Sequence, residues 1–386
     1  MHIRYLLISL IFSTTIQSAA QGDIGVERKL GQLFQQGPQV EDFSAAALAA
    51  VPWGRIEATI AGLNKALGPL EGIQLEPDGT YRLQFNRGEA RTIFALGLGE
   101  HIEAFVVTEA KFASPAIARQ AWSELPGAKS FLITKTGSQS LDLEPDLSLA
   151  VGSSFKLAVL NALRDAVARG EIKLDQVVPL PTLVSLPSGI LQDWPPGSPL
   201  TVHTLAALMI SISDNTATDI LIDLIGREKV EQYAGQNRPL LKTREMFWLR
   251  TGNASIQERW RRSDEAKKRQ ILAEIDQLPL TLADANNLGY DPNIEWRFST
   301  RELCNLITPV ANLPLMAINP GYVDPASSDS IAFKGGNDIG IVNFTTHLSK
   351  EGKSGCVSAT INSPELNLDE AVIYYMALLG TWAELQ

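Results

Sequence analysis

The stretch Val151-Gly152-Ser153-Ser154-Phe155-Lys156 decides how this chain is interpreted, because it joins an apolar strand to a helix. The strand is predicted around residues 148–151, and apolar residues from 157 to 163 continue the helix. Residues three apart share one face of a helix, so the Lys156 ammonium can lie over the Ser153 hydroxyl. The unpaired N–H groups at a helix N-terminus favour negative charge on that oxygen. The pattern therefore points to Ser153 as a nucleophile and Lys156 as its base.

Serine needs such a neighbour because its hydroxyl is a poor nucleophile until a base takes its proton. A lysine serves as that base when burial or nearby positive charge lowers its pKa. Ser154 is excluded from the same role, since Leu157 stands three residues after it. The alternative is a plain helix cap with Lys156 on the surface, and this stretch alone leaves that alternative open.

A second motif, Ser213-Asp214-Asn215, follows an apolar helical run over residues 205–211 and precedes another predicted helix. A serine and an asparagine at a junction between two helices can project into one cleft. Ser213 is then suited to relay a proton, and Asn215 to bind Lys156 or a substrate carbonyl. The alternative is an ordinary helix cap by Ser213 or Asp214.

A third motif, Lys334-Gly335-Gly336, lies within a strand predicted to start at Ser330. Glycine weakens a strand, so it often marks a place where a ligand approaches the backbone. Lys334 would then offer a cation to a substrate carboxylate. The alternative is an edge strand on which Lys334 discourages aggregation.

These three motifs, in this order, resemble the signature of class A β-lactamases and penicillin-binding proteins. The run Ser213-Asp214-Asn215-Thr216-Ala217-Thr218-Asp219 is also very similar to class A sequences. The resemblance implies an acyl-enzyme mechanism on a small-molecule substrate. The roles it implies are the acylated nucleophile for Ser153, its base for Lys156, the proton shuttle for Ser213, a positioning group for Asn215, substrate binding for Lys334 and Gly336, and an oxyanion hole for the backbone N–H groups of Ser153 and Asn337.

The resemblance covers residues 113–386 and implies an α+β fold, in which an antiparallel sheet flanked by helices lies beside an all-α lobe. Strands predicted at both ends of this segment agree with one sheet assembled from distant parts of the chain. Residues 21–110 combine helical spacing up to Leu67 with alternating strands from Gly72 to Val107. They predict a separate small α+β domain, similar to the cystatin- or NTF2-like front domain of a subgroup of exported β-lactamase-like proteins.

Two departures from the class A pattern affect the expected activity. Residues 226–249 contain no Glu-x-x-Leu-Asn, the motif whose Glu activates the deacylating water in class A enzymes. Glu228, Glu231 and Glu245 occur there in helical contexts, and none is predicted to act as that base. Gly335 stands where a threonine commonly helps to hold the substrate carboxylate. The resemblance therefore implies slow release of a β-lactam acyl group, with small esters as alternative substrates.

The first 20 residues have the features of a signal peptide. Arg4 precedes an apolar run over residues 5–12, and Ser18-Ala19-Ala20 supplies small residues for cleavage near Ala20. The run is far shorter than the roughly 20 residues that span a bilayer, which disfavours a membrane anchor. We expect export to the periplasm or the exterior, without stable membrane insertion.

The remaining composition excludes several classes of protein. A net charge of −10 disfavours binding to nucleic acid or to an anionic membrane. The four histidines form no His-Glu-x-x-His, and the two cysteines form no Cys-x-x-Cys. We therefore predict no metal, no cofactor and no nucleic-acid partner, and the composition leaves the oligomeric state open.

Two further features have competing interpretations. Cys304 in a predicted helix and Cys356 in an apolar strand favour two buried free thiols, with a single disulfide as the alternative. The charged residues 253–277 favour a solvated amphipathic helix pair over a patch that binds anionic ligands.

The sequence thus supports a serine hydrolase, and a non-catalytic protein that binds penicillin or peptidoglycan is the rival hypothesis. A pure binder has no need of a nucleophile, a base and a proton shuttle together, so the hydrolase is preferred.

Overall fold

The structure is a computed structural model that describes residues 19–251, 254–276, 278, 280 and 288–385. The chain divides into two compact units, one of residues 126–366 and one that joins residues up to 125 to residues from 367 onward. The predicted signal peptide, residues 1–20, falls mainly on residues 1–18, which lie outside the described residues. Within the described residues, no helix is long and apolar enough to cross a membrane.

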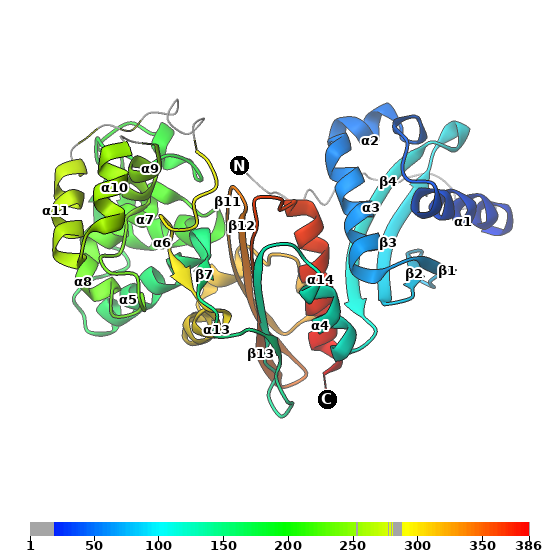
Figure 1. Cartoon of the computed structure of the whole chain (residues 1–386). Helices are drawn as coiled ribbons and strands as arrows, with labels where there is room; N and C mark the ends of the chain where they lie inside the picture. The colour runs from blue at the N-terminus through cyan, green and yellow to red at the C-terminus, as the bar shows by residue number, and fades with distance from the viewer. Residues whose placement is uncertain (1–18, 252–253, 277, 279, 281–287, 386) are drawn as a thin grey trace. The chain divides into compact units, whose positions relative to one another are not determined.

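The unit that contains the N-terminal residues is a four-stranded antiparallel sheet with helices (Figure 1). The apolar positions predicted to share a helix face, among them Ile60 and Leu63, are buried on α3. The elements are α1 (Ala19–Gln35), α2 (Ala45–Ala50), α3 (Trp53–Leu67), β1 (Leu70–Leu75), β2 (Tyr81–Phe85), β3 (Gly88–Leu96), β4 (Ile102–Phe112), α4 (Pro115–Ser123) and α14 (Leu368–Glu384), with the strands in the order β1-β2-β3-β4.

The C-terminal helix α14 belongs to this unit because it packs against α3 and β4. A Cβ at Gly380 would overlap the carbonyl oxygen of Ala110, so the helix and the strand touch at backbone distance. Lys65 and Glu370 add an ion pair of 2.7 Å between α3 and α14. The domain boundary near residues 110–113 stays a prediction, and the compact units divide at residues 125 and 366.

The larger unit is built on a five-stranded antiparallel sheet whose strands come from both ends of its sequence (Figure 1). Its strands, in spatial order, are β11 (Ser330–Asp338), β12 (Ile341–Lys350), β13 (Lys353–Asn362), β5 (Ala128–Ile133) and β6 (Leu141–Leu143). Sequence reasoning predicted strands close to four of these segments and their assembly into one sheet. Because β11 lies at the edge of the sheet, its backbone can approach another element.

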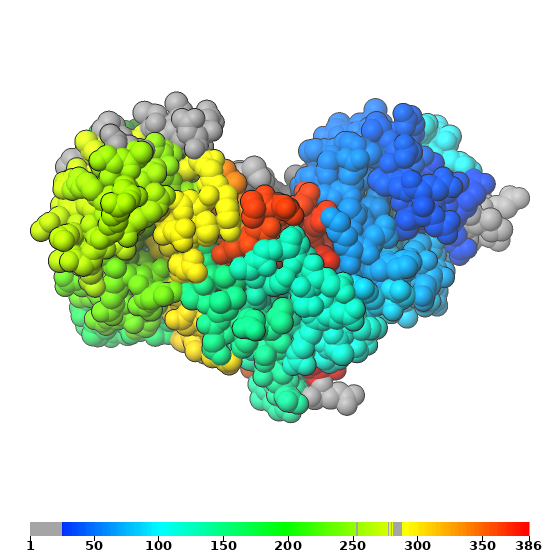
Figure 2. Space-filling view, viewed as in Figure 1, coloured from blue at the N-terminus to red at the C-terminus, as the bar shows by residue number. Residues whose placement is uncertain are grey.

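Helices that lie between these strands in the chain form a lobe around the buried helix α5 (Figure 1). The helices of residues 243–275 make one continuous yellow-green surface in Figure 2. The predicted helix pair is present as α10 and α11, which agrees with the amphipathic interpretation. The remaining elements are β7 (Leu149–Ala150), α5 (Lys156–Ala168), β8 (Val177–Pro179), β9 (Pro199–Thr201), α6 (Val202–Ser211), α7 (Asn215–Ile225), α8 (Arg227–Val230), α9 (Thr243–Thr251), α10 (Ala254–Arg262), α11 (Glu265–Ile275), β10 (Arg297–Phe298) and α13 (Thr300–Ile307).

The prediction of two free thiols is wrong, because Cys304 and Cys356 form a disulfide. Cys304 lies on α13 and Cys356 on β13, and the helix packs directly on that strand. Burial was predicted correctly for both residues. Their pairing depends on how α13 crosses the sheet, which the sequence pattern does not specify.

Candidate active site

Ser153 lies in a short 3-10 turn, η3 (Gly152–Phe155), between the strand β7 and the helix α5. No side-chain capping bond forms at the start of η3 or of α5, so the helix-cap alternative for this serine is wrong. Packing holds the turn in place, since the ring of Phe155 stacks on Trp296 with centroids 3.8 Å apart. The Val151 N–H also donates to the Trp296 carbonyl at 3.0 Å. The turn that presents Ser153 is therefore anchored on both sides.

Two glycines let the edge strand β11 approach this turn at backbone distance. Gly152 has φ +52°, a region that favours glycine, and a Cβ there would lie 2.9 Å from the backbone nitrogen of Asn337. A Cβ at Gly336 would lie 2.5 Å from the backbone nitrogen of Ser153 and would overlap the Val151 carbonyl. The structure thus brings together the two segments whose N–H groups were predicted to form the oxyanion hole.

Lys156 is fully buried at the first position of α5, which excludes the surface alternative. Its Nζ donates to the Ser213 carbonyl at 2.7 Å, to Ser213 Oγ at 3.1 Å and to Asn215 Oδ1 at 2.6 Å. Burial lowers the pKa of Lys156 to about 7, although Asp214 and Asp219 act in the opposite direction. A large fraction of this lysine is therefore neutral near pH 7 and able to accept a proton.

Ser213 lies between α6 and α7 with φ +59°, an uncommon conformation for a residue other than glycine. Its hydroxyl receives hydrogen bonds from Lys156 Nζ and from Lys334 Nζ, the latter at 3.0 Å. Ser188 donates to its carbonyl at 2.6 Å. The predicted cap is also present, but Asp214 makes it, by accepting the Ala217 N–H at 2.8 Å. In this motif Asp214 therefore caps α7, and the Ser213 hydroxyl accepts hydrogen bonds from both Lys156 and Lys334.

Lys334 on β11 is 2% exposed, which excludes the alternative of an exposed edge charge that discourages aggregation. Its Nζ bonds Ser213 Oγ and the Gly335 carbonyl. Burial, and then the charge of Lys156, lower the pKa of Lys334 well below its ordinary value. Within the described part of the chain, neither lysine forms an ion pair with a carboxylate. An anionic group that enters this site would therefore favour the protonated form of Lys334.

Lys156, Ser213, Asn215 and Lys334 thus form one hydrogen-bonded group, and the turn that carries Ser153 directly precedes Lys156. Residues 119–268 match the β-lactamase enzyme family. This match includes the first two motifs and ends before β11, which carries the third. No curated protein matches the chain.

Solved structures are similar to about 70% of the chain. A β-lactamase from Sphaerobacter thermophilus is 22% identical, with a TM-score of 0.50, and the match covers 70% of this chain and 96% of that one. A structure of PBP-A is 20% identical, with a TM-score of 0.49, covering 70% and 94%. A β-lactamase from Xanthomonas campestris is 17% identical, with a TM-score of 0.47, covering 68% and 96%. The first of these, with the antiparallel sheet and flanking helices, confirms the predicted α+β, β-lactamase-like fold.

The acidic residues that sequence reasoning rejected as bases are engaged in other contacts. Glu245 on α9 forms an ion pair of 2.6 Å with Arg227 and accepts the Lys242 N–H at 2.7 Å. Glu231 pairs with Arg269 at 2.6 Å. Glu228 is exposed. The contacts found for Glu231 and Glu245 include neither Ser153 nor Lys156.

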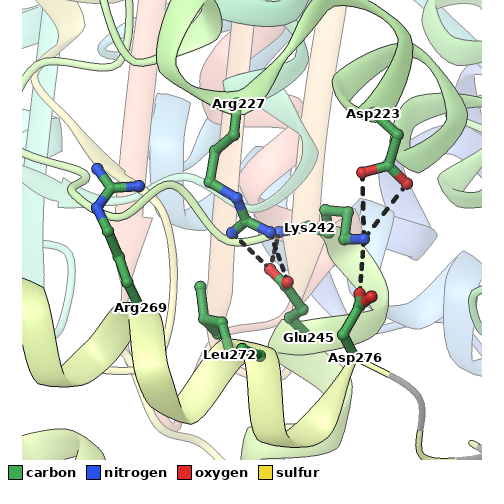
Figure 3. Close-up of a pocket in the computed structure, with 8 residues that line it drawn as sticks. Asp223, Arg227, Lys242, Glu245, Arg269, Leu272 and Asp276 are labelled. Carbon is green, nitrogen blue, oxygen red and sulfur yellow. Dashed lines mark hydrogen bonds and ion pairs between the residues drawn. The ribbon is translucent and has the colours of Figure 1, made fainter.

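A cavity of about 380 Å³ lies among α7, α8, α9 and α11 (Figure 3). Figure 3 shows the Lys242 ammonium between the carboxylates of Asp223 and Asp276, and the Arg227 guanidinium facing Glu245. Paired charges of both signs line this cavity, so it offers no unpaired charge to a ligand. The lining includes no residue of the predicted active site.

The structure reveals a role for Asp214 that the sequence analysis did not detect. Its Oδ2 accepts the backbone N–H groups of Ile190 and Leu191 at 2.7 and 3.0 Å. Asn215 adds a bond from its Nδ2 to the Leu186 carbonyl at 3.0 Å. The motif therefore holds the loop of residues 186–194 against the start of α7. An aspartate inside the motif was a visible signal, but its partners are 24 and 23 residues away in sequence.

Proposed function

We propose that this protein is an exported serine hydrolase that forms an acyl-enzyme through Ser153 with a β-lactam or a small carboxylic ester. The observation that carries the proposal is the convergence of Lys156 and Lys334 on one hydroxyl, that of Ser213, beside the Ser153 turn. A buried lysine whose pKa is about 7 matches the requirement for a base at neutral pH. A binding protein would gain nothing from a buried lysine that is half neutral.

In the proposed reaction, the neutral Lys156 amine accepts the Ser153 proton while Ser153 Oγ attacks the substrate carbonyl carbon. The backbone N–H groups of Ser153 and Asn337 stabilise the resulting oxyanion. Lys334 binds the substrate carboxylate and keeps the Ser213 hydroxyl in place. Ser213, bonded to Lys156, passes the proton to the leaving nitrogen or oxygen as the tetrahedral intermediate collapses. The product of this half-reaction is an ester on Ser153.

Release of the acyl group is expected to be the slow step with β-lactams. The sequence lacks Glu-x-x-Leu-Asn, and the two buried glutamates of that region pair with arginines. No carboxylate is thereby assigned to activate the second water. We therefore expect an initial burst followed by slow turnover with penicillins, and faster turnover with small esters whose acyl group leaves more room for water.

Covalent labelling tests the proposal directly. The protein is incubated with a fluorescent penicillin and with an ester phosphonate, and the adduct is located by mass spectrometry. We expect modification of Ser153 in the wild type and none in Ser153→Ala. An equal adduct in Ser153→Ala, or no adduct in the wild type, contradicts the proposal.

Turnover on a panel of simple esters and cephalosporins separates the hydrolase from the rival, a non-catalytic sensor. A sensor would bind these compounds and return them unchanged. Cell fractionation tests the proposed export, since the mature protein should begin after Ala20 and accumulate outside the cytoplasm. Recovery of the full-length chain from the cytoplasm would oppose that part of the proposal.

A further inference from the structure

Three charged side chains, Arg250, Glu295 and Asp338, form a buried cluster that the proposed mechanism does not use. Their side chains are 2%, 0% and 13% exposed. Arg250 Nη1 lies 3.6 Å from Glu295 Oε1 and pairs at short range with Asp338 Oδ2. Its Nη2 donates to the Gly289 carbonyl. One guanidinium from α9 thus connects two carboxylates of distant segments.

Glu295 connects the cluster to the turn that carries Ser153. Its carboxylate accepts the backbone N–H of Trp296 at 3.2 Å, and the backbone N–H of Gly152 lowers the pKa of the same carboxyl. Trp296 in turn stacks on Phe155 and accepts the Val151 N–H. Trp296, which follows Glu295, therefore holds the Val151 backbone before Ser153 and the Phe155 side chain after it.

Asp338 connects the cluster to the other half of the expected oxyanion hole. It is the last residue of β11 and directly follows Asn337. The Gly152 and Gly336 contacts show that no side chain separates this strand end from the Ser153 turn. The distance between the two backbones consequently depends on the contacts of Glu295 on one side and of Asp338 on the other. Arg250 forms an ion pair with each of these carboxylates.

The cluster is also imperfectly satisfied. In the described part of the chain, Glu295 Oε1 and Arg250 Nε are buried without a hydrogen-bond partner. Each such group costs about 1–3 kcal/mol relative to a paired one. Burial raises the pKa of Glu295 to about 7, and Arg250 opposes this shift. Because this arrangement costs stability, stability alone does not explain it.

We propose that Arg250 and Glu295 are positioning residues that set the spacing between the Ser153 and Asn337 backbone N–H groups. This inference rests on the proposed acyl-enzyme function, because the spacing matters only if an oxyanion forms there. A displaced donor weakens binding of the transition state more than binding of the substrate. Loss of the cluster should consequently slow acylation and leave the affinity for substrate nearly unchanged.

Glu295→Gln in the full-length protein is the test, because glutamine keeps the shape of the side chain and removes its charge. With a chromogenic cephalosporin, we expect the maximal acylation rate constant to fall about 10- to 100-fold. The dissociation constant of the non-covalent complex should change less than about twofold. Affinity for phenylboronic acid, whose adduct places an oxygen in the oxyanion hole, should fall in parallel with the rate.

Glu245→Gln is the matched control, since Glu245 is equally buried and also pairs with an arginine, and its hydrogen bonds in the described part of the chain go to Arg227 and Lys242. It should lower the melting temperature comparably and leave acylation unchanged. If Glu295→Gln does not fold, Asp338→Asn replaces it. The acylation rate constant should again fall while the dissociation constant stays nearly unchanged. A wild-type acylation rate in the folded variant overturns the inference, and so does an equal loss in Glu245→Gln. A wild type that never labels at Ser153 instead overturns the proposed function.

Discussion

Substitution of Lys156 by methionine tests whether burial makes this lysine the base. The structure lowers its pKa from 10.5 to about 7, chiefly by burial. At pH 7 about half of such a lysine is neutral, against roughly one in 3,000 for an exposed lysine. Burial thus raises the population of the reactive form by about 10³-fold at neutral pH. Methionine has a similar length and cannot accept a proton.

The assay is the maximal acylation rate constant, measured with saturating penicillin between about pH 5 and pH 9. Below pH 7 the wild-type rate should fall about tenfold per pH unit, because protonated Lys156 cannot act as a base, and above pH 7 it should level off. Lys156→Met should be slower by about 10³-fold at the plateau. Because the carboxyl of Glu295 also has a pKa of about 7, the pH profile is compared in the Glu295→Gln background, where Lys156→Met should show no inflection near pH 7. Saturation separates this effect from Lys334, whose protonation governs substrate affinity.

Lys242→Met is the matched control, because Lys242 is a buried lysine whose pKa is raised by its acidic partners. It should retain the inflection near pH 7. A wild-type rate that is constant across this pH range would refute the reasoning. An inflection that survives when Lys156→Met is combined with Glu295→Gln would do the same, since another group would then be the base.

Three other substitutions test the architecture around the site. Gly336→Ala should abolish labelling of the nucleophile because its Cβ would overlap the backbone of the nucleophile turn, whereas Gly54→Ala, which meets no atom within 4 Å, should label normally. Replacing both Cys304 and Cys356 by alanine should lower the melting temperature. Their bond closes a loop of 52 residues, and by restricting the unfolded chain it adds about 4 kcal/mol to the free energy of unfolding. An unchanged melting temperature would count against this. Asp214→Ala should expose the loop of residues 186–194 to proteolysis and lower the free energy of unfolding by about 1–3 kcal/mol, and Asp214→Asn should recover part of that stability. Equal resistance to proteolysis in the wild type and both variants would contradict this.

Much of the fold was predictable because its signals are local. The strands β11, β12 and β13 and the helix α14 appear in the sequence as apolar runs bounded by turns, and the structure has them close to the expected residues. Whether α14 groups with the N-terminal strands depends on packing against α3 and β4. That grouping has no local signal, since the helix follows β13 directly in the chain.

The site shows the same division. Ser153 and Lys156 were predictable as a pair because helical geometry alone brings positions three apart together. The burial of Lys334 was not predictable, because an exposed edge strand and a buried one can carry the same local sequence around this lysine. Glu295 was not detected either, because its partners Gly152 and Arg250 lie far from it in the chain and belong to no shared motif.

The sequence by itself determined most of the longer strands and helices and the positions of the three motifs along them, because these properties follow from periodicity and from spacing along a few residues. Only the tertiary structure decided that Cys304 and Cys356 pair, that Lys156 is buried enough to lower its pKa, and that Arg250 pairs with both Glu295 and Asp338. Burial and pairing depend on contacts between residues tens to hundreds of positions apart, and such contacts exist only once the chain has packed.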